Sequence, residues 1–251
     1  MRTVVALIFR EMGTTYGRSP GGYIWAVLQP VAAIAVFTVV IAIGLKIKTP
    51  SIGTNFMLFY ATGHLPYTLY LETARKIQNS LRFSRQLLMY PGVRYTDSII
   101  ARFLLNLITH IMVFYVVMTG IHIAFGLKSI LNVPAILTSL SLTAVLGLGV
   151  GMLNCFLASM FAIWDQLWSI LMRPLFLLST VIYTFEQVPQ QYQNVLWYNP
   201  LIHVIGIMRR GFYPTYEATY ASPAYVLGVG VICALFGLIF LNRYYRNFLS
   251  K

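Results

Sequence analysis

Apolar segments of about membrane-spanning length dominate this sequence of 251 residues. A helix needs roughly 20 apolar residues to cross the hydrocarbon core of a bilayer, because each residue adds about 1.5 Å. Segments that approach or exceed this length cover residues 23–45, 55–74, 98–125, 133–163, 166–185 and 224–241. The sequence therefore predicts an all-α membrane protein, with six transmembrane helices in a single domain over residues 1–251.

The composition excludes a soluble globular protein. Hydrophobic residues make up 58% of the chain, charged residues only 10%, and the mean hydropathy is +0.72. Soluble chains carry about 25% charged residues. The net charge is +12, but the basic residues lie at the ends of apolar segments and form no stripe. An anionic lipid surface or an anionic cargo is therefore expected as partner, and nucleic acid is not.

The distribution of lysine and arginine predicts the orientation. If both termini are cytoplasmic, twelve basic residues lie inside: Arg2, Arg10, Arg18, Arg75, Lys76, Arg82, Arg85, Arg94, Arg102, Arg243, Arg246 and Lys251. Five lie outside: Lys46, Lys48, Lys128, Arg209 and Arg210. Because cytoplasmic loops are enriched in basic residues, both termini are predicted to be cytoplasmic.

Arg173, followed by Pro174, lies near the middle of the apolar segment 166–185. A guanidinium at that depth costs on the order of 2.5–3.5 kcal/mol. No acidic residue lies in the middle of another apolar segment to neutralise it. Arg173 is therefore expected to face a hydrated path or a protein interface, and the chain to form part of a conduit for a large anionic cargo.

Aromatic side chains are candidates for the lining of such a conduit, because their stiff rings stack well on the C–H faces of sugars. The candidates are Tyr23, Trp25, Tyr60, Tyr67, Tyr70, Tyr183 and Phe185. Packing within the protein, or anchoring at the membrane surface, is the alternative role for each of them.

Three segments outside the spans have distinct patterns. Residues 1–20 form an amphipathic helix, which is predicted to lie in the membrane interface or to cap the first span. Residues 81–91 are predicted to form a short helix that exposes apolar side chains to a partner, or to lie flat on the headgroups. Residues 187–213 contain apolar pieces too short to span, which favours paired re-entrant helices. In the fourth span, the Gly147, Gly149 and Gly151 positions predict close helix packing.

Motifs for catalysis are absent from the sequence. There is no phosphate-binding G-x-x-x-x-G-K-[ST], no H-E-x-x-H, no G-x-S-x-G and no C-x-x-C. The cysteines Cys155 and Cys233 lie within apolar runs and suggest neither a disulfide nor a metal site. Near the predicted cytoplasmic edge, Glu72, Asp97 and Asp165 are expected to pair with Arg75, Arg94 or Arg102. Energy for transport would then come from another subunit.

Several stretches resemble the membrane subunits of ABC-2 type polysaccharide exporters, above all the capsular group. They are FREMGTTYGRSPGGYIWAVLQP (9–30), YTDSIIAR (95–102), RPLFLLSTVIYTFEQVPQQY (173–192) and LWYNPLIHVIGIMRRGF (196–212). The first contains Arg10 and Glu11 on the interface helix, followed by Gly22, Tyr23, Trp25 and Pro30. The N-P-L-x-H element at 199–203 is the most specific. The chain departs from the family at Trp164, where an arginine is common before the aspartate, and at Thr180, where glycine or proline is common.

The resemblance implies a homodimer in a bacterial inner membrane that binds two copies of a separate nucleotide-binding ATPase. It implies no cofactor in this chain, with ATP and Mg²⁺ on the partner subunit. Residues 81–91 would be the coupling helix, with contacts from Arg82, Arg85, Leu87, Leu88 and Tyr90. The cargo would be a lipid-linked acidic polysaccharide, passed outward to periplasmic and outer-membrane components. Alternatives are an exporter of O-antigen, teichoic acid or a small hydrophobic compound, a membrane enzyme acting on lipid-linked sugars, and a structural scaffold.

Overall fold

The computed structural model describes residues 2–15, 22, 24–44, 50–88, 94–127 and 129–249. Over these ranges the chain is helical and forms no strand. The helices are α1 (Arg2–Thr15), α2 (Ile24–Gly44), α3 (Phe56–Gln78), α4 (Ser80–Leu88), α5 (Tyr95–Phe125), α6 (Val133–Met160), α7 (Trp164–Leu178), the 3₁₀ turn η1 (Phe185–Gln187), α8 (Gln190–Leu196), α9 (Pro200–Phe212) and α10 (Pro223–Leu249).

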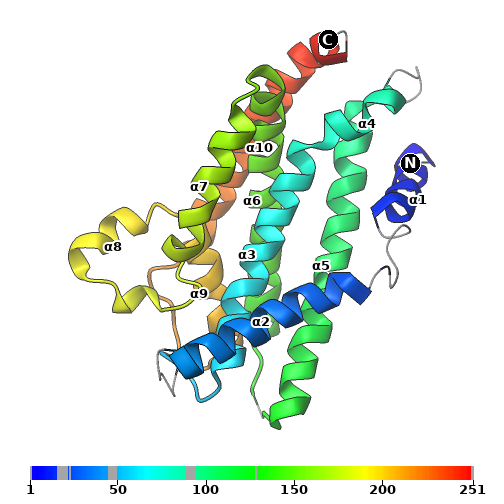
Figure 1. Ribbon diagram of the computed structural model, residues 1–251. Helices are drawn as coiled ribbons and strands as arrows, with labels where there is room; N and C mark the ends of the chain where they lie inside the picture. Colours follow the sequence, from blue (N-terminus) through cyan, green and yellow to red (C-terminus); the bar gives the residue numbers. More distant parts are fainter. Residues whose placement is uncertain are drawn as a thin grey trace.

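Helix α6 is the centre of the bundle, with α3 and α10 packed along it (Figure 1). Small residues allow these close approaches. At Gly149 an added Cβ would collide with the carbonyl group of Gly230 on α10, and at Gly147 with the Thr73 side chain on α3. The sequence prediction of close packing along this glycine stripe is confirmed.

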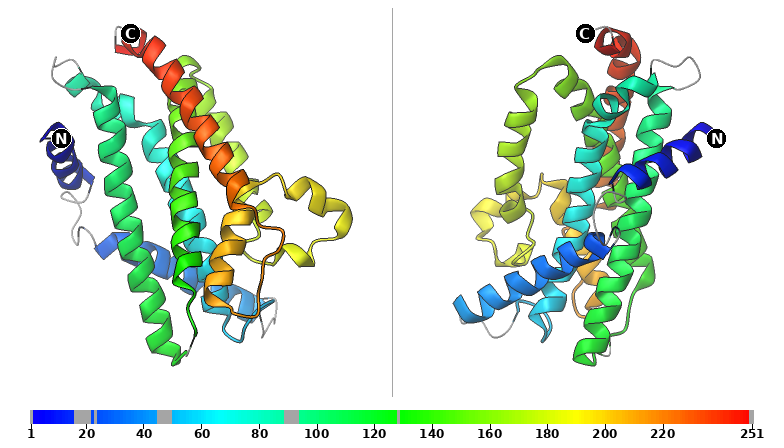
Figure 2. Two further views of the ribbon diagram at one scale, coloured as in Figure 1. Left: turned by 180° about the vertical axis from the view of Figure 1, so that it is seen from behind. Right: turned by 45° about the vertical axis from the view of Figure 1, so that its right-hand side comes forward.

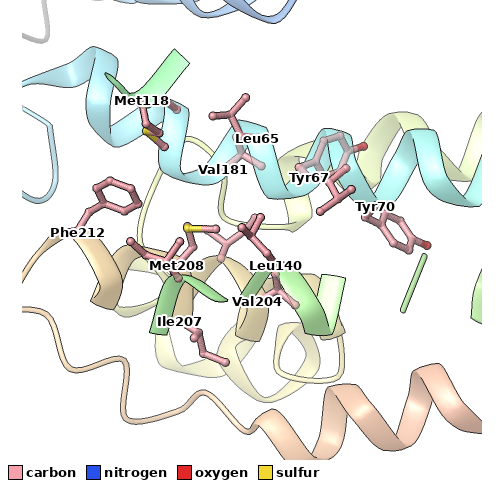
Figure 3. Close-up of a cluster of buried hydrophobic side chains, with 14 of the residues drawn as sticks. Leu65, Tyr67, Tyr70, Met118, Leu140, Val181, Val204, Ile207, Met208 and Phe212 are labelled. Atoms are coloured by element: carbon pink, nitrogen blue, oxygen red, sulfur yellow. The ribbon is translucent and has the colours of Figure 1, made fainter. Parts of the chain in front are cut away.

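The main hydrophobic core lies between α3, α5, α6 and α9. Figure 3 shows ten labelled members of this cluster, from Leu65 on α3 to Phe212 at the end of α9. Val181, from the segment that follows α7, lies among them and is fully buried. Between helices in a membrane, such side chains stabilise the fold through close van der Waals packing. The core therefore fixes α9 against the long helices.

Three of the described helices are clearly long and apolar enough to cross a membrane: Tyr95–Phe125, Val133–Met160 and Pro223–Tyr245. Helix α3 is also long but more polar, and the apolar part of α2 is the shorter segment Ile24–Val40. Helix α2 lies obliquely across α3 and α5 instead of running alongside them (Figures 1 and 2). The count of six transmembrane helices therefore stays a prediction.

The short elements lie around the long helices. Helix α4 lies at the same end as the C-terminus, with α1 beside α5 nearby, and α8 projects sideways from about the middle of the bundle (Figures 1 and 2). Helix α1 exposes the apolar side chains Val5 and Phe9, the latter 67% exposed. An interface helix would present such side chains to a lipid headgroup layer, and that location of α1 stays a prediction.

Helix α7 ends at Leu178, whereas the sequence predicts an apolar span over 166–185. The chain turns at Thr180, whose φ of +57° lies in the left-handed region that residues other than glycine rarely adopt. At this position the resemblance noted in the sequence leads one to expect glycine or proline instead of Thr180. Neither residue is needed here, because other parts of the chain hold the turn.

Candidate functional site

Helix α4 is tied to the start of α7 by one polar cluster. The Nη1 atom of Arg82 forms an ion pair with the Asp165 carboxylate, and its Nη2 atom donates to the Ala158 carbonyl oxygen at 2.7 Å. The amide of Gln78 donates to the other oxygen of Asp165 at 2.6 Å. Asp165 lies in the first turn of α7, where a carboxylate also stabilises the helix dipole. A displacement of α4 would therefore act directly on α7.

A second cluster ties α4 to α1 and α5. The Nε atom of Arg102 on α5 donates to the buried Glu11 carboxylate on α1 at 3.0 Å. The guanidinium of Arg102 also lies 4.1 Å from the ring centroid of Phe83 on α4. Arg10 reaches the same ring at 5.8 Å. Arg10 and Glu11, the two residues predicted for the interface helix, therefore contact α4 and α5, respectively.

The ion pairs differ from those expected from the sequence. Asp165 pairs with Arg82, and Arg102 pairs with Glu11, neither of which was an expected partnership. The Asp97 carboxylate accepts from the backbone N–H of Arg94 at 3.2 Å and caps α5. The prediction was wrong for Arg102 because α1 folds back onto α5, a contact between residues far apart in the sequence.

The coupling residues are only partly described. Arg82 is held as above, and Arg85 is exposed on α4. The side chains of Leu87 and Leu88, and the whole of Tyr90, lie outside the described residues. The structure does place a nine-residue helix where the sequence predicts one.

Arg173 is exposed on α7, a helix that buries none of its residues in this chain. Large apolar side chains on the same helix are also exposed: Leu167, Ile170, Leu171, Leu177 and Leu178. A helix with this composition needs lipid or another subunit around it. The surface of α7 is therefore where a second protein or a cargo could reach Arg173.

Two of the predicted aromatic residues form a seam between α2, α3 and α7. Tyr60 stacks on Phe37 with ring centroids 4.3 Å apart, and on His64 at 5.1 Å. Tyr67 donates a hydrogen bond to the Met172 carbonyl oxygen at 3.2 Å and meets Phe176 edge-to-face at 5.3 Å. Because Met172 precedes Arg173, this seam positions the part of α7 that carries the arginine.

The other aromatic candidates are not brought to one surface. Tyr23 lies outside the described residues, and Trp25 is 54% exposed on α2. Tyr70 is buried, and Phe185 is buried against Tyr220. Tyr183 is half-buried in the turn after α7 and donates to the Leu177 carbonyl oxygen at 2.8 Å. A shared role in lining a conduit stays a prediction.

Arg209 is the buried cation that sequence reasoning missed. The distribution of basic residues counts Arg209 only as one of five charges on the outside, but its side chain on α9 is 0% exposed. Its guanidinium donates to the carbonyl oxygens of Tyr183 and Val181 at 2.7 and 2.9 Å, and lies 4.2 Å from the ring centroid of Phe59. Arg209 therefore holds the turn that ends α7.

Two tyrosines complete the environment of this turn. Tyr216 donates to the Glu186 carboxylate at 3.2 Å and lies 3.1 Å from the Tyr220 hydroxyl. Burial raises the pKa of Tyr220 to about 12, and it raises the pKa of Tyr216 above its usual range. Both phenols therefore stay protonated and able to donate at neutral pH.

The N-P-L-x-H element braces the same region. Asn199 caps α9 by accepting from the Leu201 N–H at 3.1 Å, and its amide donates to Leu178 and Ser179. The buried His203 accepts from the Ser222 N–H through Nδ1 at 3.1 Å, so its Nε2–H donates to the Trp197 carbonyl oxygen at 2.8 Å. The element joins α7, α8, α9 and the start of α10, which is a structural task.

The amino-acid sequence matches a known transporter family. Residues 2–213 match the sequence profile of the family described as ABC-2 type transporter. The chain belongs to the ABC-2 type transporter family. The matched region of this ABC-2 protein runs from α1 to the end of α9, and it includes both polar clusters at α4 as well as Arg173 and Arg209. It is a multi-pass membrane protein, in accordance with its family and its apolar helices.

Similarity to individual ABC-2 proteins covers nearly the full length. The polysialic acid transport protein KpsM of Escherichia coli is 27% identical over 94% of this chain and 91% of its own length. The capsule polysaccharide export inner-membrane protein CtrC of Neisseria meningitidis is 25% identical over 98% and 92%. The corresponding BexB of Haemophilus influenzae is 24% identical over 98% and 92%.

No group of three or more His, Cys, Asp or Glu side chains in the described ranges could hold a metal ion. Cys155 and Cys233 are free thiols. The polar residues of this ABC-2 chain instead connect the short helices α1 and α4 to the helices α5 and α7. The arrangement suits transmission of movement to a surface that carries a cation.

Proposed function

We propose that this chain is the membrane subunit of an ATP-driven exporter that moves lipid-linked capsular polysaccharide outward across the inner membrane. The observation that carries the proposal is similarity over nearly the whole chain to three capsule or polysialic acid export proteins. The family assignment supports a transport role, in which a separate subunit hydrolyses ATP with Mg²⁺. Two such ATPase subunits and two copies of this chain would form the complete exporter.

Helix α4 is the proposed docking element for the ATPase. It is amphipathic and nine residues long, and it lies near α1 at the end of the bundle that carries the C-terminus (Figure 1). A cytoplasmic location of both termini, as the distribution of basic residues predicts, would place α4 on the side of ATP hydrolysis. Movement of the ATPase would pass through Arg82 and Asp165 into α7.

Arg173 is the proposed contact for acidic groups of the cargo. It is exposed on a helix that has no fully buried residue, so a second copy of the protein could enclose it beside a hydrated path. Guanidinium groups bind carboxylate and phosphate through charge-assisted, often paired hydrogen bonds. The exported polymer would continue to periplasmic and outer-membrane components.

Complementation tests the function and the docking helix together. Cells that lack this chain should lose their surface polysaccharide and accumulate polymer inside, and the unaltered chain should restore export. Leu88→Asp should fail to restore export while reaching the membrane at normal levels, because a buried carboxylate disrupts an apolar contact with the ATPase. Surface polymer and co-purified ATPase are the readouts. Retained export with the ATPase still bound would show that the docking helix is misplaced.

An exporter of O-antigen is the second candidate. The O-antigen export system permease protein RfbA of Klebsiella pneumoniae is 20% identical over 96% of this chain and 91% of its own length. The same deletion distinguishes the two functions, since it shows whether a capsule or the O-antigen disappears from the cell surface.

A further inference from the structure

Two cavities meet at the end of the bundle opposite α4, where α3 and α6 begin and α5 and α9 end (Figures 1 and 2). The larger has a volume of about 890 Å³ and lies between the start of α6 and the chain that follows α9. The smaller, of about 310 Å³, lies between the start of α3 and the end of α9. Ile130 and Pro214 line both cavities, which therefore form one continuous groove, called here the distal groove.

The larger cavity offers both donors and acceptors. Arg210 and Glu217 line it together with Asn132 and Thr219, and all four side chains are exposed. Arg210, Glu217 and Thr219 make no hydrogen bond or ion pair within the described part of the chain. The Asn132 side-chain oxygen caps α6 by accepting from the Ala135 N–H at 3.2 Å, which leaves its amide hydrogens to donate. A guanidinium only donates, a carboxylate only accepts and a hydroxyl does both, so the groups are balanced and carry no net charge.

The smaller cavity adds polar groups without charge. Its polar side chains are Thr54, Asn55 and Ser129. The Asn55 oxygen caps α3 by accepting from the Leu58 N–H at 3.1 Å, so the amide hydrogens of Asn55 are left to donate. Most of the remaining lining is apolar. A sugar ring combines the same two properties, with hydroxyl groups around its edge and C–H groups on its faces. Both volumes lie within the range of about 300–1,000 Å³ that is typical of small-molecule sites.

Both cavities are joined to the segment that follows α7. Ser51, just before the smaller cavity, donates from its hydroxyl to the Gln187 side-chain oxygen of η1 at 2.8 Å. Tyr216, which lines the larger cavity, donates to the Glu186 carboxylate of η1 at 3.2 Å. Helix α7 begins beside α4 and runs toward this end of the bundle (Figure 1). A polymer that moves outward along the exposed face of α7 would therefore reach the distal groove after passing Arg173.

We propose that the distal groove binds sugar units of the exported polymer through their hydroxyl groups. Glu217 accepts from a pair of neighbouring hydroxyls, and Arg210 donates to hydroxyl or ring oxygens, both through charge-assisted hydrogen bonds. The balanced charge favours hydroxyls over carboxylates and phosphates, because Glu217 repels an anionic group in the same cavity. The inference rests on the proposed export function and adds to it a second contact, which reads hydroxyls where Arg173 reads acidic groups.

The test is oligosaccharide binding by the purified full-length protein, measured by isothermal titration calorimetry in a detergent without a sugar headgroup. The probe is an oligosaccharide of one size, cut from the surface polymer of cells that produce this chain. A second form has every carboxyl group reduced to an alcohol, and a third form is also methylated on every hydroxyl. We expect the first two forms to bind within about threefold of each other, and the methylated form to bind about tenfold more weakly, because it cannot donate to Glu217.

Variants locate the site. Glu217→Gln and Arg210→Met should each weaken binding of the first two forms about five- to tenfold, since each removes charge-assisted hydrogen bonds. Glu217→Gln should leave the weak binding of the methylated form unchanged. Thr219→Val should weaken binding of the first two forms about threefold, as the loss of one neutral hydrogen bond allows. Thr215→Val is the matched control, because Thr215 is exposed nearby but does not line the groove. Unaltered binding by the Glu217→Gln and Arg210→Met variants would overturn the proposal.

The distal groove and the export function fail in different ways. If deletion of this chain leaves the surface polymer in place, the export function itself is wrong. If deletion removes the polymer but its oligosaccharides bind equally well to the groove variants, only the groove is wrong. Poor export by Glu217→Gln with unchanged oligosaccharide binding would also overturn the proposal, and would indicate a protein partner in the groove.

Discussion

Replacing Arg209 with methionine is expected to lower the free energy of unfolding by about 2–4 kcal/mol. The substitution leaves the carbonyl oxygens of Val181 and Tyr183 buried without a donor, at about 1–3 kcal/mol each. The methionine variant no longer has to bury a positive charge, and this gain offsets part of the loss in stability. Denaturant unfolding of the purified protein in detergent micelles measures the change.

Arg210→Met is the matched control, because the neighbouring Arg210 is exposed. Its effect should stay within about 0.5 kcal/mol. Arg209→Lys should recover only part of the stability, since a single ammonium group cannot reproduce the fixed fork of a guanidinium. An Arg209→Met variant as stable as Arg210→Met would show that the turn after α7 does not depend on this residue.

Breaking the Arg82–Asp165 pair is expected to lower export about tenfold or more while leaving ATP hydrolysis in place. The pair has side-chain exposures of 50% and 33%, so its contribution to stability is small. The proposed role of the pair is to transmit movement from α4 to α7. Asp165 accepts hydrogen bonds from both Arg82 and Gln78 and so connects the two helices. A loss of one or two charge-assisted hydrogen bonds is enough for a tenfold change in coupling.

The measurement compares surface polymer with ATPase activity in Asp165→Asn, Arg82→Gln and the exchanged pair Arg82→Asp with Asp165→Arg. The exchanged pair should regain part of the export, because it restores the attraction between the two helices. Export that falls equally in all three variants would mean that the pair acts in another way. Export that stays normal in the single variants would remove it from the mechanism.

Hydropathy located most of the helices, because apolar runs of spanning length have few other structures available. It could not give their tilt, which depends on packing against neighbouring helices. Helix α2 illustrates this limit, since its apolar sequence predicts a span but its path lies obliquely across α3 and α5 (Figure 1). Helix α4 was also predictable, from the alternation of apolar and basic residues ahead of a proline and glycine.

The break after α7 could not be predicted from local sequence. No glycine or proline lies between Leu175 and Gln187 to signal a turn. The turn depends on donors from distant residues, namely Asn199, which caps α9, and Arg209 on α9. Arg209 itself gave only a weak signal, as the first of two adjacent arginines at the end of an amphipathic apolar run. The partnership of Arg102 with Glu11 was similarly hidden, because it joins residues 91 positions apart.

We propose that Arg173 meets an anionic polymer inside a two-fold assembly. The most direct measurement is surface export by cells producing Arg173→Gln, Arg173→Lys or the control Leu171→Ala, at matched membrane levels and with the ATPase co-purifying. Leu171 is exposed on the same helix and carries no charge. We predict that Arg173→Gln loses most export, that Arg173→Lys keeps part of it, and that Leu171→Ala exports normally. Undiminished export by Arg173→Gln would contradict the claim.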